Sequence, residues 1–198
     1  WFEERHATRR SPLLKLLTQN MLSILYYIWL AVICTVMLIL SLVALALTYP
    51  FEKSRRLVHE MSRYLSLSFL LPFPSRVEGL ENVDRRGRYV IVLNHQAMVD
   101  IGALYHVPLN FRWVSKREVF RIPFFGQYLW VHGDICIDRG HAAMAMEQLL
   151  RKGKLWLSRG VSVAIFPEGT RSKDGEMHRF KAGAFTLAKE AGVAILPV

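Results

Sequence analysis

The segment Val90-Ile91-Val92-Leu93-Asn94-His95-Gln96-Ala97-Met98-Val99-Asp100 decides both the fold and the chemistry expected of this chain. Its four apolar residues are typical of a buried strand, which delivers His95 to the carboxyl end, where open α/β sheets bind ligands. On a regular helix, positions five apart point about 140° away from each other. His95 and Asp100 can therefore pair only if the chain turns between them, and we predict a strand that turns into a helix.

Strand-like and helical patterns alternate in the chain around and beyond this segment. Apolar β-like runs cover residues 89–93, 111–114, 135–137, 161–166 and 193–198, and helical patterns cover 119–131, 142–157 and 182–191. Gly160 and Gly192 are expected to end the helices that precede them. The alternation predicts an α/β fold with a mainly parallel or mixed sheet flanked by helices.

The N-terminal part predicts a helical membrane anchor. No charged residue or histidine occurs from Leu16 to Phe51, and a helix of that length exceeds the roughly 30 Å hydrocarbon core. A single apolar helix and a hairpin over 16–51 both fit. Basic residues flank both ends of the run, so its orientation stays open. Residues 51–71 predict an amphipathic helix on a membrane surface, with a core-packing helix as the alternative. We thus expect an anchor over 1–71 and a catalytic domain over 72–198.

The charge balance excludes few partners by itself. Lys and Arg number 26 against 16 acidic residues, which gives a formal net charge of +10. Such a charge suits nucleic acid or an anionic membrane. The basic residues are spread along the chain and no nucleic-acid module is recognisable, so we favour membrane lipids and expect no nucleic-acid partner. Cys34 and Cys136 cannot build a disulfide framework, and no Cys/His spacing suggests a metal site.

The residue types around His95 suit acid–base chemistry. An imidazole can accept a proton near neutral pH, and a carboxylate on its other nitrogen fixes the tautomer and stabilises the imidazolium. A histidine and an aspartate at this spacing also occur by chance, so an ordinary loop histidine is the alternative. No Gly-x-Ser-x-Gly elbow is present, which argues against a covalent hydrolase mechanism.

Three further blocks accompany the histidine block. Lys116 leads through Ile122-Pro123-Phe124-Phe125-Gly126 to Ile137-Asp138-Arg139, the run Phe166-Pro167-Glu168-Gly169-Thr170-Arg171-Ser172 follows a strand, and Ile195-Leu196-Pro197-Val198 closes the chain. In order and spacing the four blocks resemble the glycerolipid acyltransferase family of 1-acylglycerol-3-phosphate (PlsC-type) enzymes. The resemblance covers residues 79–198. Family members often have Ser where this chain has Ala97, and the fourth block is truncated, so we expect part of the fold to follow it.

The resemblance implies a role for each matching position. His95 is the expected catalytic base and Asp100 its partner. Lys116, Arg139 and Arg171 are expected to bind the phosphate of the acceptor, since guanidinium groups bind phosphate oxygens bidentately. Further substrate contacts are expected from Glu168, Gly169 and Thr170. Lys181, beside the start of a helix, is a secondary candidate for an anion site.

The implied reaction is transfer of a fatty acyl group to the sn-2 hydroxyl of 1-acylglycerol 3-phosphate (lysophosphatidic acid), giving phosphatidic acid. Acyl-CoA or acyl carrier protein is the expected donor, as a co-substrate, with no cofactor. The family implies attachment to the cell inner membrane or its equivalent, with the catalytic domain facing the cytoplasm. Another lipid acceptor, such as a lysophospholipid, glycerol 3-phosphate or an acyl-amino-acid lipid, fits the same motifs, and a non-catalytic membrane-binding protein is the alternative from another class.

Overall fold

The computed structural model describes residues 12–71, 75–172 and 174–198. Its centre is a five-stranded, wholly parallel sheet in the order β3-β2-β4-β1-β5. The strands are β1 (Tyr89–Val92), β2 (Phe111–Lys116), β3 (Ile135–Ile137), β4 (Ser162–Ile165) and β5 (Ala194–Pro197). Because all strands run the same way, the loops that follow them share one edge, the carboxyl edge of the sheet.

Helices cover both faces of this sheet, which explains why the strand sequences are continuously apolar. On one face, α5 (Ala142–Ser158) and α6 (Gly183–Ala191) bury residues such as Leu149, Trp156 and Leu187 against β1 and β4. The other face packs against the segment from α3 (Val99–Ala103) to Leu109 and against α2 (Arg56–Leu70). The α/β class with flanking helices is therefore confirmed, and the sheet is parallel and not mixed.

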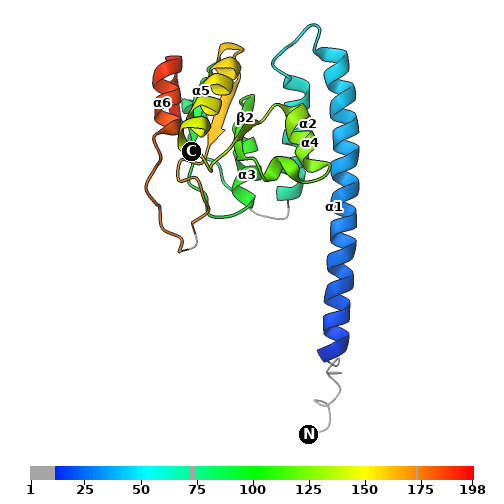
Figure 1. Cartoon of the computed structure of the whole chain (residues 1–198). Helices are drawn as coiled ribbons and strands as arrows, with labels where there is room; N and C mark the ends of the chain where they lie inside the picture. Colours follow the sequence, from blue (N-terminus) through cyan, green and yellow to red (C-terminus); the bar gives the residue numbers. More distant parts are fainter. Residues whose placement is uncertain (1–11, 72–74, 173) are drawn as a thin grey trace.

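The apolar N-terminal run is one continuous helix, α1 (Pro12–Thr48), and no hairpin interrupts it. Within the described residues, Gln19–Thr48 is the one helix long and apolar enough to cross a membrane. Every residue from Gln19 to Trp29 is exposed, and partial burial begins at Leu30, where α1 packs against α2 and α4 (Phe125–His132). The N-terminal part of α1 thus extends beyond the globular part of the molecule (Figure 1).

Helix α2 packs against the domain with one side and is exposed on the other. Val58, His59, Ser62 and Leu70 are buried, whereas Leu57, Tyr64 and Phe69 are exposed on the apolar side expected to face a membrane. The helix begins at Arg56, five residues later than the sequence pattern predicts. The Glu52 carboxylate accepts hydrogen bonds from the amides of Ser54 and Arg56, and Arg55 has a left-handed backbone (φ 53°), so this stretch forms a turn.

The helix expected over 119–131 is broken into a 3₁₀ turn (Val119–Arg121) and α4. Pro123 restricts the residue before it and has no amide to donate, and Phe124 takes a positive φ of 62°. The remaining helix and strand boundaries agree with the sequence pattern to within about two residues, the range over which assignments of helix ends vary.

A buried histidine pair, His59 and His132, joins α2 to α4. His59 Nδ1 lies 3.3 Å from His132 Nε2, and His59 Nε2 lies 2.9 Å from the Leu109 carbonyl oxygen. His132 Nδ1 lies 2.8 Å from the Asp134 carboxylate, which also accepts the Trp113 amide. Burial lowers the pKa of His59 well below 6.5 and also lowers that of His132. Burial therefore disfavours the protonated form of both rings.

Candidate active site

The sequence-predicted histidine and aspartate meet at the carboxyl end of β1. His95 Nδ1 lies 3.0 Å from Asp100 Oδ2, and the His95 side chain is only 13% exposed. The intervening residues form the turn into α3 that the sequence requires. Since a carboxylate only accepts hydrogen bonds, Nδ1 carries the proton and Nε2 keeps a free lone pair. The arrangement leaves Nε2 as the proton-accepting atom.

Backbone amides of the turn between His95 and α3 hold the Asp100 side chain, and these hydrogen bonds also stabilise the turn. Its Oδ2 accepts hydrogen bonds from the amides of Gln96 (2.7 Å) and Ala97 (2.8 Å) as well as from His95. Partial burial alone would raise the pKa of Asp100, but the bonds from the Ala97 amide, the His95 ring and the Gln96 amide outweigh it and lower the pKa. The carboxylate is therefore charged at neutral pH and available to stabilise an imidazolium.

Phe166 holds the histidine ring from the side of β4. The two rings stack with centroids 3.9 Å apart and planes 16° from parallel, and Phe166 in turn stacks on Trp113 of β2. The sequence reasoning gave Phe166 no role, although the residue directly follows a strand next to β1. This stacking limits ring rotation, so it orients Nε2 together with the Asp100 hydrogen bond.

Glu168 is buried, with 5% of its surface exposed. One carboxylate oxygen accepts the His95 amide and the other accepts the His178 amide, each at 3.3 Å. The Ser172 amide donates to the His95 carbonyl oxygen at 2.8 Å. Glu168 thus fixes the backbone on both sides of the site, and its carboxylate is turned toward these amides.

Two basic side chains gather at Gly169. The Arg139 guanidinium donates to the Gly169 carbonyl oxygen, and the Lys181 ammonium lies 2.7 Å from where a β-carbon on residue 169 would be. Gly169 has φ +79°, which L side chains rarely adopt. The turn after β4 therefore places two positive charges beside the backbone next to Glu168.

The other predicted substrate contacts lie at the same edge but make no side-chain hydrogen bond with a described residue. Lys116 is the last residue of β2, and Thr170 and Arg171 follow Gly169; all three are exposed. Lys116, Arg139 and Arg171 therefore lie at or after the carboxyl ends of three different strands, β2, β3 and β4. Positive charges placed in this way can bind a phosphate group.

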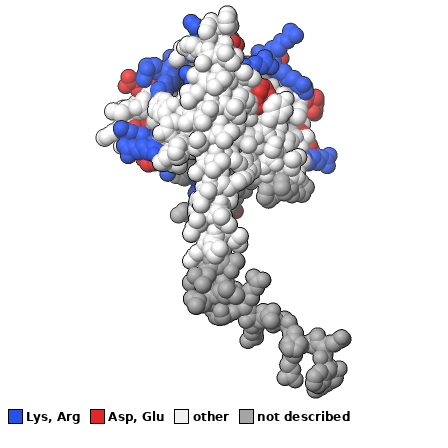
Figure 2. Space-filling view, turned by 90° about the vertical axis from the view of Figure 1, so that its right-hand side faces the viewer, with Lys and Arg blue, Asp and Glu red and all other residues white. Residues whose placement is uncertain are grey.

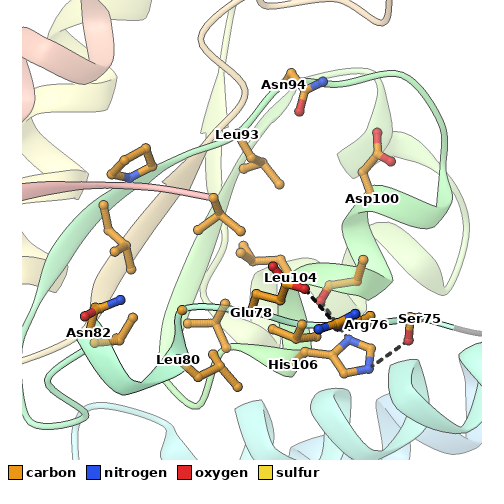
Figure 3. Close-up of a pocket in the computed structure, with 18 residues that line it drawn as sticks. Ser75, Arg76, Glu78, Leu80, Asn82, Leu93, Asn94, Asp100, Leu104 and His106 are labelled. Carbon is orange, nitrogen blue, oxygen red and sulfur yellow. Dashed lines mark hydrogen bonds and ion pairs between the residues drawn. The ribbon is translucent and has the colours of Figure 1, made fainter.

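A cavity of about 730 Å³ lies beside Asp100. Asn94 and Asp100 lie at one end of it, and Ser75, Arg76 and His106 lie at the other (Figure 3). The Arg76 guanidinium forms an ion pair with Glu78 at 2.8 Å. Apolar side chains such as Leu93 and Leu104 line the space between. The cavity thus offers a partly apolar volume beside the Asp100 carboxylate.

A histidine paired with a partly buried aspartate, beside several basic residues at the carboxyl edge of a parallel sheet, suits general-base chemistry on an anionic substrate. The family model described as "Acyltransferase" matches residues 74–198, and the chain belongs to this family.

Curated relatives agree with this assignment. A chloroplastic 1-acyl-sn-glycerol-3-phosphate acyltransferase of Arabidopsis thaliana is 33% identical over 92% of this chain and 52% of the relative. The enzyme of that name from Pseudomonas aeruginosa is 40% identical over 62% of this chain and 47% of the relative. The chain thus spans about half the length of the curated relatives that it matches.

A solved structure is also similar. The 1-acyl-sn-glycerophosphate acyltransferase PlsC from Thermotoga maritima aligns with a TM-score of 0.68 and 26% identity, over 91% of this chain and 73% of that chain. The fold expected from the four sequence blocks is therefore confirmed.

Proposed function

We propose that this chain transfers a fatty acyl group from acyl-CoA or acyl carrier protein to the sn-2 hydroxyl of 1-acylglycerol 3-phosphate, giving phosphatidic acid. The observation that carries the proposal is the pairing of His95 Nδ1 with the Asp100 carboxylate, at the sheet edge that also carries the basic residues Lys116, Arg139 and Arg171. The names of the curated relatives support the same acceptor.

In the proposed step, His95 Nε2 removes the proton from the acceptor hydroxyl while the oxygen attacks the thioester carbonyl. The carbon–sulfur bond then breaks. The leaving thiolate takes the proton from the imidazolium and departs as a thiol. Asp100 stabilises the imidazolium between these two transfers. The attacking oxygen comes from the acceptor, so no acyl-enzyme is required.

Arg139, Arg171 and Lys116 are the proposed phosphate ligands. The cavity beside Asp100 is the proposed place for an acyl chain, because apolar side chains such as Leu93 and Leu104 line the part between its polar ends. The exposed apolar helix α1 supports membrane attachment, and we propose that the catalytic domain faces the cytoplasm, where acyl donors are made.

The test is acyl transfer by the chain reconstituted in liposomes, with lysophosphatidic acid, lysophosphatidylcholine and glycerol 3-phosphate as acceptors. Each acceptor is combined with acyl-CoA and with acyl carrier protein, and products are identified by mass spectrometry. We expect phosphatidic acid, and none with His95→Ala. Preferred acylation of lysophosphatidylcholine or glycerol 3-phosphate would reassign the acceptor while keeping the chemistry.

Phosphate binding is tested separately with Arg171→Ala, because Arg171 makes no side-chain hydrogen bond within the described chain that its removal would break. A charge-assisted contact is worth about 1.5 to 3 kcal/mol, so the acceptor KM should rise roughly 10-fold to 150-fold. The donor KM should stay unchanged. A selective rise in the acyl-CoA KM would place Arg171 at the phosphates of the donor instead.

A further inference from the structure

A second cavity lies at the carboxyl end of β3, the edge strand next to β2. It has a volume of about 400 Å³ and is lined by the loop after β2, by the end of β3 and by residues of α4 and α5. It shares no lining residue with the cavity beside Asp100. We call it the β3 pocket, and its lining includes Arg117, Arg121, Trp130, Asp138, Gln148 and Lys152.

Positive charge dominates the β3 pocket. Three cations, Arg117, Arg121 and Lys152, face one carboxylate, Asp138, which leaves a formal charge of +2. Arg117 is paired with Asp138, with Nη1 3.1 Å from Oδ2. Arg121 and Lys152 form no ion pair with any residue that the structure describes. Two such cations at one small cavity suit the phosphates of a ligand.

Trp130 of α4 adds an aromatic surface to these charges. Its ring packs against Phe120 with centroids 4.8 Å apart, and the Lys152 ammonium lies 5.1 Å from the ring centre. The tryptophan is nevertheless 50% exposed. An aromatic ring can stack on a nucleic-acid base, and neighbouring cations can bind the attached phosphates. The combination is therefore suited to a phosphorylated nucleotide.

Gln148 supplies a polar group on the side of α5. Its Oε1 accepts the Asp138 amide at 2.9 Å, so the side chain is held at the end of β3. Because the oxygen is used in this way, the two N–H groups of the amide are the part that a ligand would meet. A donor of this kind suits a ring nitrogen of a purine base.

The β3 pocket is joined to the active site by consecutive residues. Asp138 lines the pocket, and the next residue, Arg139, donates to the Gly169 carbonyl oxygen in the turn after β4. In the sheet, β3 is three positions from β1, a separation of roughly 14 Å. The extended pantetheine arm of coenzyme A, between its nucleotide and its thioester, spans a separation of this order.

The apolar helix α1 leaves access to charged ligands on its flanks. Figure 2 shows basic side chains on either side of α1, whereas the outward face of this helix carries none where it crosses the globular part. The β3 pocket includes Trp130 of α4, and α4 packs against α1. A water-soluble anion therefore reaches the pocket beside α1 and not across it.

We propose that the β3 pocket binds the phosphorylated adenosine end of acyl-CoA. Arg121 and Lys152 bind its phosphates, Trp130 contacts the adenine, and the pantetheine arm follows the carboxyl edge of the sheet to His95. The proposal rests on the proposed function, with acyl-CoA as the donor. It assigns the phosphates of the donor to different cations from the phosphate of the acceptor.

Binding is measured first, without acyl transfer. Coenzyme A carrying a fluorophore on its thiol is titrated with the detergent-solubilised chain, and fluorescence anisotropy gives the Kd. We expect displacement by adenosine 3′,5′-bisphosphate, and a Kd about 10-fold higher in the double variant Arg121→Ala/Lys152→Ala, since two half-exposed charge contacts are lost. Arg151→Ala, an exposed cation of α5 outside the pocket, is the matched control and should bind as the wild type does.

Steady-state kinetics then separates the nucleotide from the rest of the donor. The double variant should raise the KM for acyl-CoA about 10-fold and leave the KM for acyl-pantetheine, which lacks the nucleotide, unchanged. An equal rise for both donors would overturn the proposal, as would an unchanged Kd for the fluorescent coenzyme A.

The two measurements also distinguish this proposal from the proposed function. If the wild-type chain transfers acyl groups but the bisphosphate displaces nothing, the β3 pocket is not the nucleotide site and the function stands. If the bisphosphate competes and the double variant weakens binding, but no acyl transfer occurs with any donor, the pocket is supported and the function fails. A KM that rises for acyl carrier protein and not for acyl-CoA would assign the cations to an acidic protein donor instead.

Discussion

Replacing Asp100 by Asn isolates the contribution of its charge. All three hydrogen bonds to this side chain end on the single oxygen Oδ2, and an asparagine oxygen placed there can accept the same three bonds. The turn and the histidine tautomer should therefore survive. Only the negative charge, 3.0 Å from the histidine nitrogen, is lost.

The expected effect follows from that charge. A hydrogen bond to a charged group is worth about 1 kcal/mol more than a neutral one, which sets a lower limit of roughly 5-fold. A carboxylate about 4 Å from a developing imidazolium contributes about 4 kcal/mol at an effective dielectric constant of about 20, which sets an upper limit of roughly 1,000-fold. We expect kcat to fall by about 100-fold to 1,000-fold, because the side chain is mostly buried.

The assay is steady-state acyl transfer in liposomes, with Asp174→Asn as the matched control. Asp174 forms a second aspartate–histidine pair at the same edge, 3.1 Å from His178 Nε2, but both side chains are more than half exposed. Asp174→Asn should leave kcat nearly unchanged. An Asp100→Asn enzyme with more than a fifth of the wild-type kcat would refute the assignment of Asp100 as the partner of the base.

Further expectations concern the supporting residues. Gly169→Ala should lower activity far more than Gly160→Ala. Both glycines have positive φ, but only a β-carbon at 169 would meet Lys181. The kcat and the melting temperature of both variants test this. Phe166→Leu should lower kcat several-fold with little change in KM, since it removes the stacking that orients His95; an unchanged kcat would exclude that role. Acidification below about pH 6.5 should lower the unfolding free energy, because the unfolded state binds protons that the native state does not. The loss is at most about 1.4 kcal/mol per pH unit for each member of the buried histidine pair. Denaturant unfolding from pH 7 to 5 measures this, and rising stability would mean that the pair shares a proton between its rings.

The elements of the catalytic domain were largely predictable because their signals are local. The apolar run before His95 and the one before Phe166 predict strands, and the structure contains both. The pairing of His95 with Asp100 was predictable because the turn between them lies within one segment. The substrate-binding roles of Lys116 and Arg171 remain predictions.

What the sequence did not show depends on contacts between distant segments. The buried histidine pair joins residues 73 positions apart, so no local pattern distinguishes these histidines from surface ones. The break at Phe124 was missed because the helical pattern of apolar residues continues through Pro123. The stacking of Phe166 on His95 was also missed, since it depends on β1 and β4 being neighbours, which chain order alone does not determine.

The pairing of β4 with β1 explains why the motif that contains His95 and the motif that contains Phe166 form one structural unit. The backbone of His95 donates to Glu168 and accepts from Ser172, and its ring stacks on Phe166, so three residues of the second motif hold one residue of the first. Strand order places the two loops side by side, because β4 pairs directly with β1. His95 is therefore positioned by the loop after β4 as much as by its own strand.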